Sequence, residues 1–220
     1  MDVNMTGNTE ENTQREQNLK TAGQLFSFIQ ASPSPFHAVA NMKRELDAHG
    51  YAQLLEGEEW RLEEEGKYYV IRNGSALIAF RIPKRDFTGF QIMASHSDSP
   101  SFKIKENPEM DVEGHYVKLN VEKYGGMLCA PWFDRPLSVA GRVIVRDGSR
   151  LVTRLVNIDR DLCMIPNLAI HMNREANEGY KYNVQKDMLP LYGCGGSGGM
   201  FMEDIARAAG VAQEDMIGSD

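Results

Sequence analysis

The stretch Gln91-Ile92-Met93-Ala94-Ser95-His96-Ser97-Asp98-Ser99-Pro100 is the most informative part of the chain. Its first half is apolar and predicts a buried strand over residues 89–95, and a proline closes the polar turn that follows. A histidine at a strand end stands on rigid backbone and opens into a loop, which suits a metal ligand. An aspartate two residues on can accept a hydrogen bond from the other ring nitrogen and fix its tautomer. The motif indicates zinc hydrolase chemistry, although a loop histidine bonded to a nearby carboxylate has the same pattern.

The composition is that of an acidic protein with enough apolar residues for a core. Of the 220 residues 42% are hydrophobic, which allows one large domain or two small ones. The net charge of −7, with no basic block, argues against nucleic acid or an anionic membrane as a partner. No run approaches the roughly 20 apolar residues of a membrane span, and the polar N-terminus has no secretory signal. The separated cysteines Cys129, Cys163 and Cys194 show no metal spacing, so we expect a cytoplasmic protein.

Hydrophobic periodicity and turn signals predict an α/β chain. Residues 1–17 lack periodicity, which predicts a disordered tail. Helical spacing begins at Leu19, and Ser34 before Pro35 predicts the N-cap and first residue of a second helix that ends near Gly50. Further strands are expected at 67–72 and 75–82 around an Asn73-Gly74 turn, and at 102–105, 115–123, 137–146, 150–158 and 183–190. The glycine-rich run 193–199 predicts a flexible link before a helix over 201–209, and it lacks the Gly-Lys-Ser/Thr of a phosphate loop.

Two other clusters contain residue types that take part in chemistry. In the run Trp132-Phe133-Asp134-Arg135-Pro136, a charge pair and an aromatic contact are possible, but a structural turn with an aromatic anchor is the simpler interpretation. Asp134 has no second ligand at metal spacing. His171 lies in the apolar run 165–174, which by itself predicts a core or interface histidine.

Taken in order from Leu19 to the end of the chain, these segments resemble the aspartyl aminopeptidase family of zinc metalloaminopeptidases. The resemblance is carried by residues 32–39 (SPSPFHAV), 95–100 (SHSDSP), 121–126 (VEKYGG), 132–137 (WFDRPL), 140–143 (AGRV) and 166–174 (PNLAIHMNR). Six segments in a family-like order are far more specific than any one of them.

The resemblance implies a two-zinc hydrolase that removes N-terminal residues, acidic ones above all, from peptides. The position matching His96 is a zinc ligand, and the position matching Asp98 orients that ligand. The implied fold is a catalytic α/β domain, present here in part over residues 18–100 and followed by an inserted β-rich assembly domain over residues 101–220. Members form homo-oligomers (tetrahedral dodecamers). The position matching His171 reaches into a neighbouring subunit's active site, which makes His171 a functional residue.

The chain departs from the resembled family in length, because members are about twice as long. A bridging aspartate, a further acidic ligand, a last histidine and the glutamate general base follow the assembly domain in that family. The chain stops at Asp220, so we expect His96 to hold metal weakly and the 220-residue chain to be weakly active or inactive. The alternatives are an inactive truncated module for assembly or interaction, and a coding frame that continues past Asp220.

Overall fold

The computed structural model describes residues 6–84 and 87–220. The chain divides into two compact units, Met1–Ser97 and Asp98–Asp220. The division lies close to the boundary expected after residue 100. Catalytic and assembly roles for the two units stay predictions.

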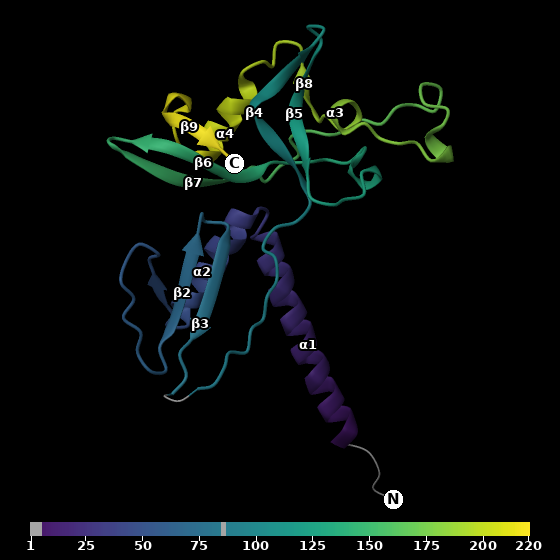
Figure 1. Cartoon of the computed structure of the whole chain (residues 1–220). Helices are drawn as coiled ribbons and strands as arrows, with labels where there is room; N and C mark the ends of the chain where they lie inside the picture. The colour runs from purple at the N-terminus through teal and green to yellow at the C-terminus, as the bar shows by residue number, and fades with distance from the viewer. Residues whose placement is uncertain (1–5, 85–86) are drawn as a thin grey trace, which may run out of the picture. The chain divides into compact units, whose positions relative to one another are not determined.

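The first unit combines two helices with a small sheet. Its elements are α1 (Thr6–Gln30), α2 (Pro35–Ala48), β1 (Ala52–Leu54), β2 (Lys67–Arg72) and β3 (Ala76–Arg81). The sheet has the order β1-β2-β3, with β1 parallel to β2 and β2 antiparallel to β3. Helix α2 lies against one face of this sheet (Figure 1). The hairpin predicted around Asn73-Gly74 is confirmed, and both turn residues have positive φ as such a turn requires.

The start of α2 is set by local side chains, as the sequence predicts. Ser34 is the N-cap, and its hydroxyl accepts a hydrogen bond from the amide of His37 at 3.4 Å. The same hydroxyl lies 2.7 Å from Nδ1 of His37, and burial lowers the pKa of this histidine. Phe36 and Val39 then enter the core of the unit. His37 therefore serves the helix start.

A buried tyrosine joins α2 to the sheet. Tyr69 on β2 is 0% exposed, so its hydroxyl needs partners inside the unit. It donates to the carboxylate of Asp47 at 2.7 Å and accepts from the ammonium of Lys43 at 2.9 Å. Lys43 and Asp47 also form an ion pair at 2.8 Å, so the three groups close a ring of contacts.

The expected disorder of residues 1–17 differs from the structure, in which α1 already begins at Thr6. Residues 1–5 of the expected tail lie outside the described part. The segment is rich in Glu and Gln, which favour helix even without an apolar face, and Gln14 bonds Asn18 one turn later at 3.0 Å. The apolar residues of the last turns stay exposed, at 63% for Leu19 and 64% for Phe26.

The second unit contains two antiparallel sheets. One has the order β4-β5-β8, with β4 (Ser101–Val112), β5 (Tyr116–Tyr124) and β8 (Leu191–Cys194). The other has the order β7-β6-β9, with β6 (Ala140–Asp147), β7 (Arg150–Asn157) and β9 (Met216–Ser219). The short helices α3 (Val184–Asp187) and α4 (Met200–Ala209) and three 3-10 turns complete the unit (Figure 1).

One apolar cluster joins these sheets to α4. Its buried residues come from β5, β6, β7, α4 and the segments beside them: Leu119, Val121, Val143, Val145, Val156, Ile158, Leu162, Leu189, Phe201 and Ile205. Burying side chains of this size stabilises a fold by about 1.5–3 kcal/mol each before the cost of ordering the chain. The cluster is therefore the main source of stability in this unit.

Glu109 on β4 caps the N-terminus of α4. Its carboxylate accepts hydrogen bonds from the amides of Gly199 and Phe201, the latter at 2.7 Å. Gly199 is the N-cap residue, and its φ of +85° is a backbone conformation that residues with a side chain rarely adopt. A carboxylate at this end satisfies amides that have no partner in the helix and complements the helix dipole.

Strand β9 attaches along β6 through both backbone and charge. Asp220 exchanges two backbone hydrogen bonds with Arg142, at 2.9 and 2.8 Å. Its carboxylate also pairs with Lys103 at 2.8 Å and with Arg142 at 3.2 Å. Gly141 makes this approach possible, because a Cβ there would lie 2.3 Å from the Asp220 carbonyl oxygen.

Two strand predictions in this unit are wrong in detail. Residues 183–190 were expected to form a strand, but 184–187 form α3, whose N-cap Asn183 accepts from the amide of Gln185 at 3.1 Å. The expected strand 102–105 continues to Val112 as β4, because a bulge between Ile104 and Glu109 lets the pairing resume beyond Pro108.

The Glu109→Ala substitution is expected to lower the free energy of unfolding by about 1–2 kcal/mol, because it removes the side-chain cap of α4. Urea unfolding followed by circular dichroism measures this change. Glu106→Ala, on the exposed side of the same strand, is the matched control and should stay within about 0.5 kcal/mol of the parent protein. Equal losses in both variants would contradict the capping role.

The pH dependence of stability is expected to report the Asp220 contacts. The hydrogen bond from Lys103 lowers the pKa of Asp220 below its ordinary value of 3.8. A carboxyl group whose pKa is lowered in the folded state stabilises the fold at pH values above its ordinary pKa. This stabilisation is lost as the pH falls through the pKa of the folded state. Urea midpoints should therefore fall more between about pH 5 and about pH 3 in the parent protein than in Asp220→Asn. Asp147→Asn serves as the control, and a parent-like acid response in Asp220→Asn would refute this assignment.

Candidate functional site

The segment that carries His96 is not the strand that its sequence predicts. Residues 87–96 have no regular secondary structure, and the expected strand 89–95 is absent from the described fold. Ile92 is 83% and Met93 99% exposed, and His96 is exposed as well. A strand needs a neighbour for its backbone groups, and apolar composition alone does not supply one.

Asp98 is half-buried and accepts a hydrogen bond from the hydroxyl of Tyr124 at the end of β5. This hydrogen bond is the main reason why the pKa of Tyr124 is raised above its ordinary value, and the negative charge of the Asp98 carboxylate raises it further. Pro100 packs closely against Gly125, where a Cβ would lie 3.5 Å from the proline Cα. This packing brings the segment around Asp98 together with the end of β5. The sequence reasoning did not predict Tyr124 as the partner of Asp98, because nothing in the pattern relates two residues so far apart.

His171 lies in a tight turn of an exposed loop. The turn is closed by hydrogen bonds from the amide of Met172 to Ala169 at 2.8 Å and from Asn173 to Ile170 at 3.3 Å. In Figure 1 this loop is the green segment that extends away from the sheets of its unit. Leu168, Ile170 and Met172 are 58%, 48% and 75% exposed, and His171 is also exposed. The apolar residues on either side of His171, from Leu168 to Met172, therefore do not belong to the core of the described unit.

Asp134 connects the second sequence cluster to this loop. Its carboxylate accepts a hydrogen bond from the amide of Asn167 at 2.9 Å, and its own amide donates to the carbonyl of Ile165 at 3.0 Å. Trp132 packs edge-on against Phe102 of β4, with ring centroids 5.1 Å apart. The interpretation of this cluster as a structural turn with an aromatic anchor is thus confirmed. No local sequence pattern predicts the contact with Asn167.

No group of three or more His, Cys, Asp or Glu side chains with a metal-binding arrangement occurs among the described residues. His96 lies in the first unit, whereas Asp98 and His171 belong to the second. A zinc site needs about three protein ligands besides water. The described residues therefore do not form a zinc site by themselves.

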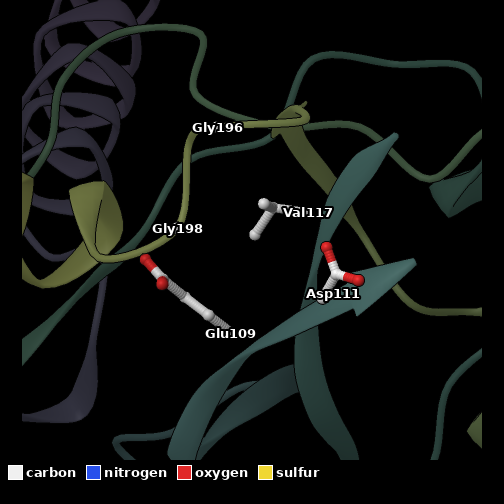
Figure 2. A pocket seen from close by; sticks show the side chains of 5 residues that line it. All are labelled: Glu109, Asp111, Val117, Gly196 and Gly198. Atoms are coloured by element: carbon white, nitrogen blue, oxygen red, sulfur yellow. The ribbon is translucent and has the colours of Figure 1, made fainter. Parts of the chain in front are cut away.

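One open pocket of about 440 Å³ lies beside the tip of the β4–β5 hairpin (Figure 2). Glu109, Asp111, Val117, Gly196 and Gly198 line it. Both carboxylates have structural tasks, because Glu109 caps α4 and Asp111 accepts from the amide of Gly114 at 3.0 Å. This pocket lacks the convergent, uncommitted polar groups of a binding site.

The mixed α/β fold is similar to that of solved aminopeptidase structures. It matches a chain of the Ape4 and Nbr1 complex with a TM-score of 0.83 and 33% identity, over 90% of this chain and 42% of that one. It matches the mApe1 dodecamer structure of S. cerevisiae with a TM-score of 0.72 and 26% identity, over 90% of this chain and 46% of that one.

The chain belongs to the aminopeptidase I zinc metalloprotease (M18) family, whose model matches residues 28–220. A probable M18 family aminopeptidase 2 of Clostridium acetobutylicum is 52% identical over 179 residues. That match covers 80% of this chain but only 41% of the relative, so the chain spans less than half the length of this curated protein. In the described part of the chain, every helix is too short or too polar to cross a membrane.

The Asp98→Asn substitution is expected to bring the pKa of Tyr124 back toward 10, because it removes the carboxylate that accepts the Tyr124 hydrogen bond and whose charge disfavours ionisation of the phenol. Assigned ring signals of Tyr124, followed by NMR against pH, measure this pKa. The backbone signals of Tyr116, at the other end of β5, are the internal control for an intact fold and should be alike in both proteins. An unchanged Tyr124 pKa in Asp98→Asn would contradict the contact.

Proposed function

We propose that this chain is the N-terminal part of a zinc-dependent aminopeptidase that hydrolyses N-terminal, mainly acidic, residues from peptides. Membership of the M18 family over residues 28–220 is the observation that carries the proposal, since the matched range contains His96, Asp98 and His171. The preference for acidic N-terminal residues is the most specific part of the proposal, and it rests on the resemblance to aspartyl aminopeptidases alone.

In this proposal His96 contributes one ligand to a site of two zincs, and Asp98 orients that ligand. The exposed imidazole of His96 is accessible to a metal, and a carboxylate two residues away has the chemistry of an orienting acceptor. The hydrogen bond from Tyr124 would hold that carboxylate in place. Metal bound in such a site polarises the scissile carbonyl and activates water. The remaining ligands and the general base would come from polypeptide other than the described residues.

His171 is proposed to act in the active site of a neighbouring subunit, with the second unit serving as an inserted assembly domain. Support comes from the loop itself, which carries His171 among exposed apolar side chains on a segment that extends from the sheets (Figure 1). Exposed apolar residues on a projecting loop are typical of an interface. The solved structure of mApe1 is a dodecamer, which favours a homo-oligomer here.

A second candidate function is that of an assembly or interaction module without catalysis. It is favoured by the apolar side chains that the first unit exposes: Leu19, Leu25, Phe26, Ile29, Phe90, Ile92 and Met93. So many exposed apolar residues mark a surface that other polypeptide covers. Both candidates thus need a partner surface, but only the first needs His96.

A reducing cytoplasm is the proposed location. Cys129, Cys163 and Cys194 are free thiols in the described structure. Burial raises the pKa of the Cys163 thiol to about 11, which keeps it protonated and unreactive.

The purified 220-residue chain is expected to keep well below one zinc per chain after dialysis against metal-free buffer, because one histidine holds zinc weakly. Elemental analysis measures this, with His115→Ala as control for adventitious binding by a histidine that the proposal does not use. A value close to two zincs would contradict the proposed division of ligands.

The catalytic proposal is tested by mixing the chain with the C-terminal remainder of the Clostridium acetobutylicum relative in the presence of zinc. Release of N-terminal aspartate from a peptide should appear in the mixture and be weak or absent with the chain alone. His96→Ala should abolish it, whereas His115→Ala should retain it. Activity that survives His96→Ala would refute the ligand role, and a stable inactive complex would support the assembly module.

A further inference from the structure

The loop that carries His171 is held at both ends by two adjacent residues. At its start, Asn167 donates its amide to the carboxylate of Asp134 at 2.9 Å. At its end, the ring of Tyr182 packs against Phe133 with centroids 5.1 Å apart. Tyr180 stacks edge-on against Tyr182 at 5.4 Å and extends this contact into the loop. Between these ends every residue except the half-buried Asn173 is exposed.

The turn at Asp134 is itself anchored in the core. Phe133 forms a parallel bridge with Ile165, whose side chain is 0% exposed, and the amide of Asp134 donates to the Ile165 carbonyl at 3.0 Å. Leu137 continues this pairing in the antiparallel sense with Cys163. The start of the loop is therefore attached to a rigid part of the unit, and Asp134 provides the last contact before the chain becomes exposed.

The anchor is continued toward His171 by short-range hydrogen bonds. The side-chain oxygen of Asn167 accepts from the amide of Leu168 at 2.9 Å, and the carbonyl of Ala169 accepts from the amide of Met172 at 2.8 Å. Each bond fixes the backbone that follows it. The direction in which the loop leaves Asn167 thus determines where His171 is presented.

We propose that Asp134 is a positioning residue that sets the direction of the His171 loop through its bond to the Asn167 amide. The importance of this positioning for catalysis rests on the proposed role of His171. The anchoring of the loop by Asp134 does not depend on that role. Without the bond, the Asn167 amide has only water as a partner and the loop leaves the sheets in several directions.

The conformation of Asp134 explains why few residues can replace it. Its φ of +54° lies in the left-handed region, which Asp, Asn and Gly tolerate better than other residues. Asparagine keeps both the conformation and an acceptor oxygen for Asn167. Glycine keeps only the conformation, and alanine keeps neither. The three substitutions therefore separate backbone strain from the hydrogen bond.

The test is amide hydrogen exchange, read by NMR, on the 220-residue chain with Asp134→Asn, Asp134→Gly and Asp134→Ala. The Asn167 amide should exchange about tenfold faster in the Gly and Ala variants, because an ordinary hydrogen bond to a charged group is lost, and should stay near the parent rate in Asn. The backbone signals of His171 should shift and broaden in Gly and Ala alone. Arg135→Ala is the matched control at the neighbouring exposed position.

Global stability, followed by urea unfolding, distinguishes positioning from simple loss of fold. The proposal expects the Gly variant to unfold near the parent midpoint while its loop exchanges faster. Parent-like exchange at Asn167 in both Gly and Ala would overturn it, and so would an Asn variant that fails to restore the His171 signals. None of these readings depends on zinc or on peptidase activity, so failure of the proposed function would leave them unchanged.

Discussion

Apolar contact between two small sheets and one helix is the interaction on which the second unit depends. Val121 of β5, Val143 of β6 and Phe201 of α4 meet in one buried cluster, and each is at most 2% exposed. Each three-stranded sheet contributes apolar side chains to this cluster, and sheets this small need such packing to be stable. The cluster therefore stabilises the sheets together, and it includes Leu162, a few residues before the start of the His171 loop.

Polar side chains then place the ends of elements that the apolar cluster leaves undetermined. Glu109 reaches from a strand to cap α4, Ser34 caps α2 within its own turn, and Asp134 fixes the first residue of a loop. Of these, the cap at Ser34 was predictable because donor and acceptor are three residues apart. The contacts of Glu109 and Asp134 join residues that are distant in sequence, so no local sequence pattern predicts them.

The residues of the candidate site were found by motif, but their surroundings were not. His96, Asp98 and His171 all occur in the segments that the M18 family model covers. The apolar pattern predicted a buried strand before His96 and a core or interface position for His171, whereas residues 89–96 and His171 are exposed in the described structure. Apolar residues indicate that a segment is covered in some assembly. They do not say by which polypeptide, because burial depends on the partner surface.

The sequence by itself determined the family, the helix at Ser34-Pro35, the hairpin at Asn73-Gly74 and the positions of strands β6 and β7. These features rest on contacts between near neighbours, whose geometry follows from local dihedral preferences and capping. Only the tertiary structure decided that residues 87–96 form no strand, that Glu109 caps α4 and that Asp134 holds the His171 loop. Each of these depends on whether a distant segment supplies a hydrogen-bond partner, and that is a property of the folded chain.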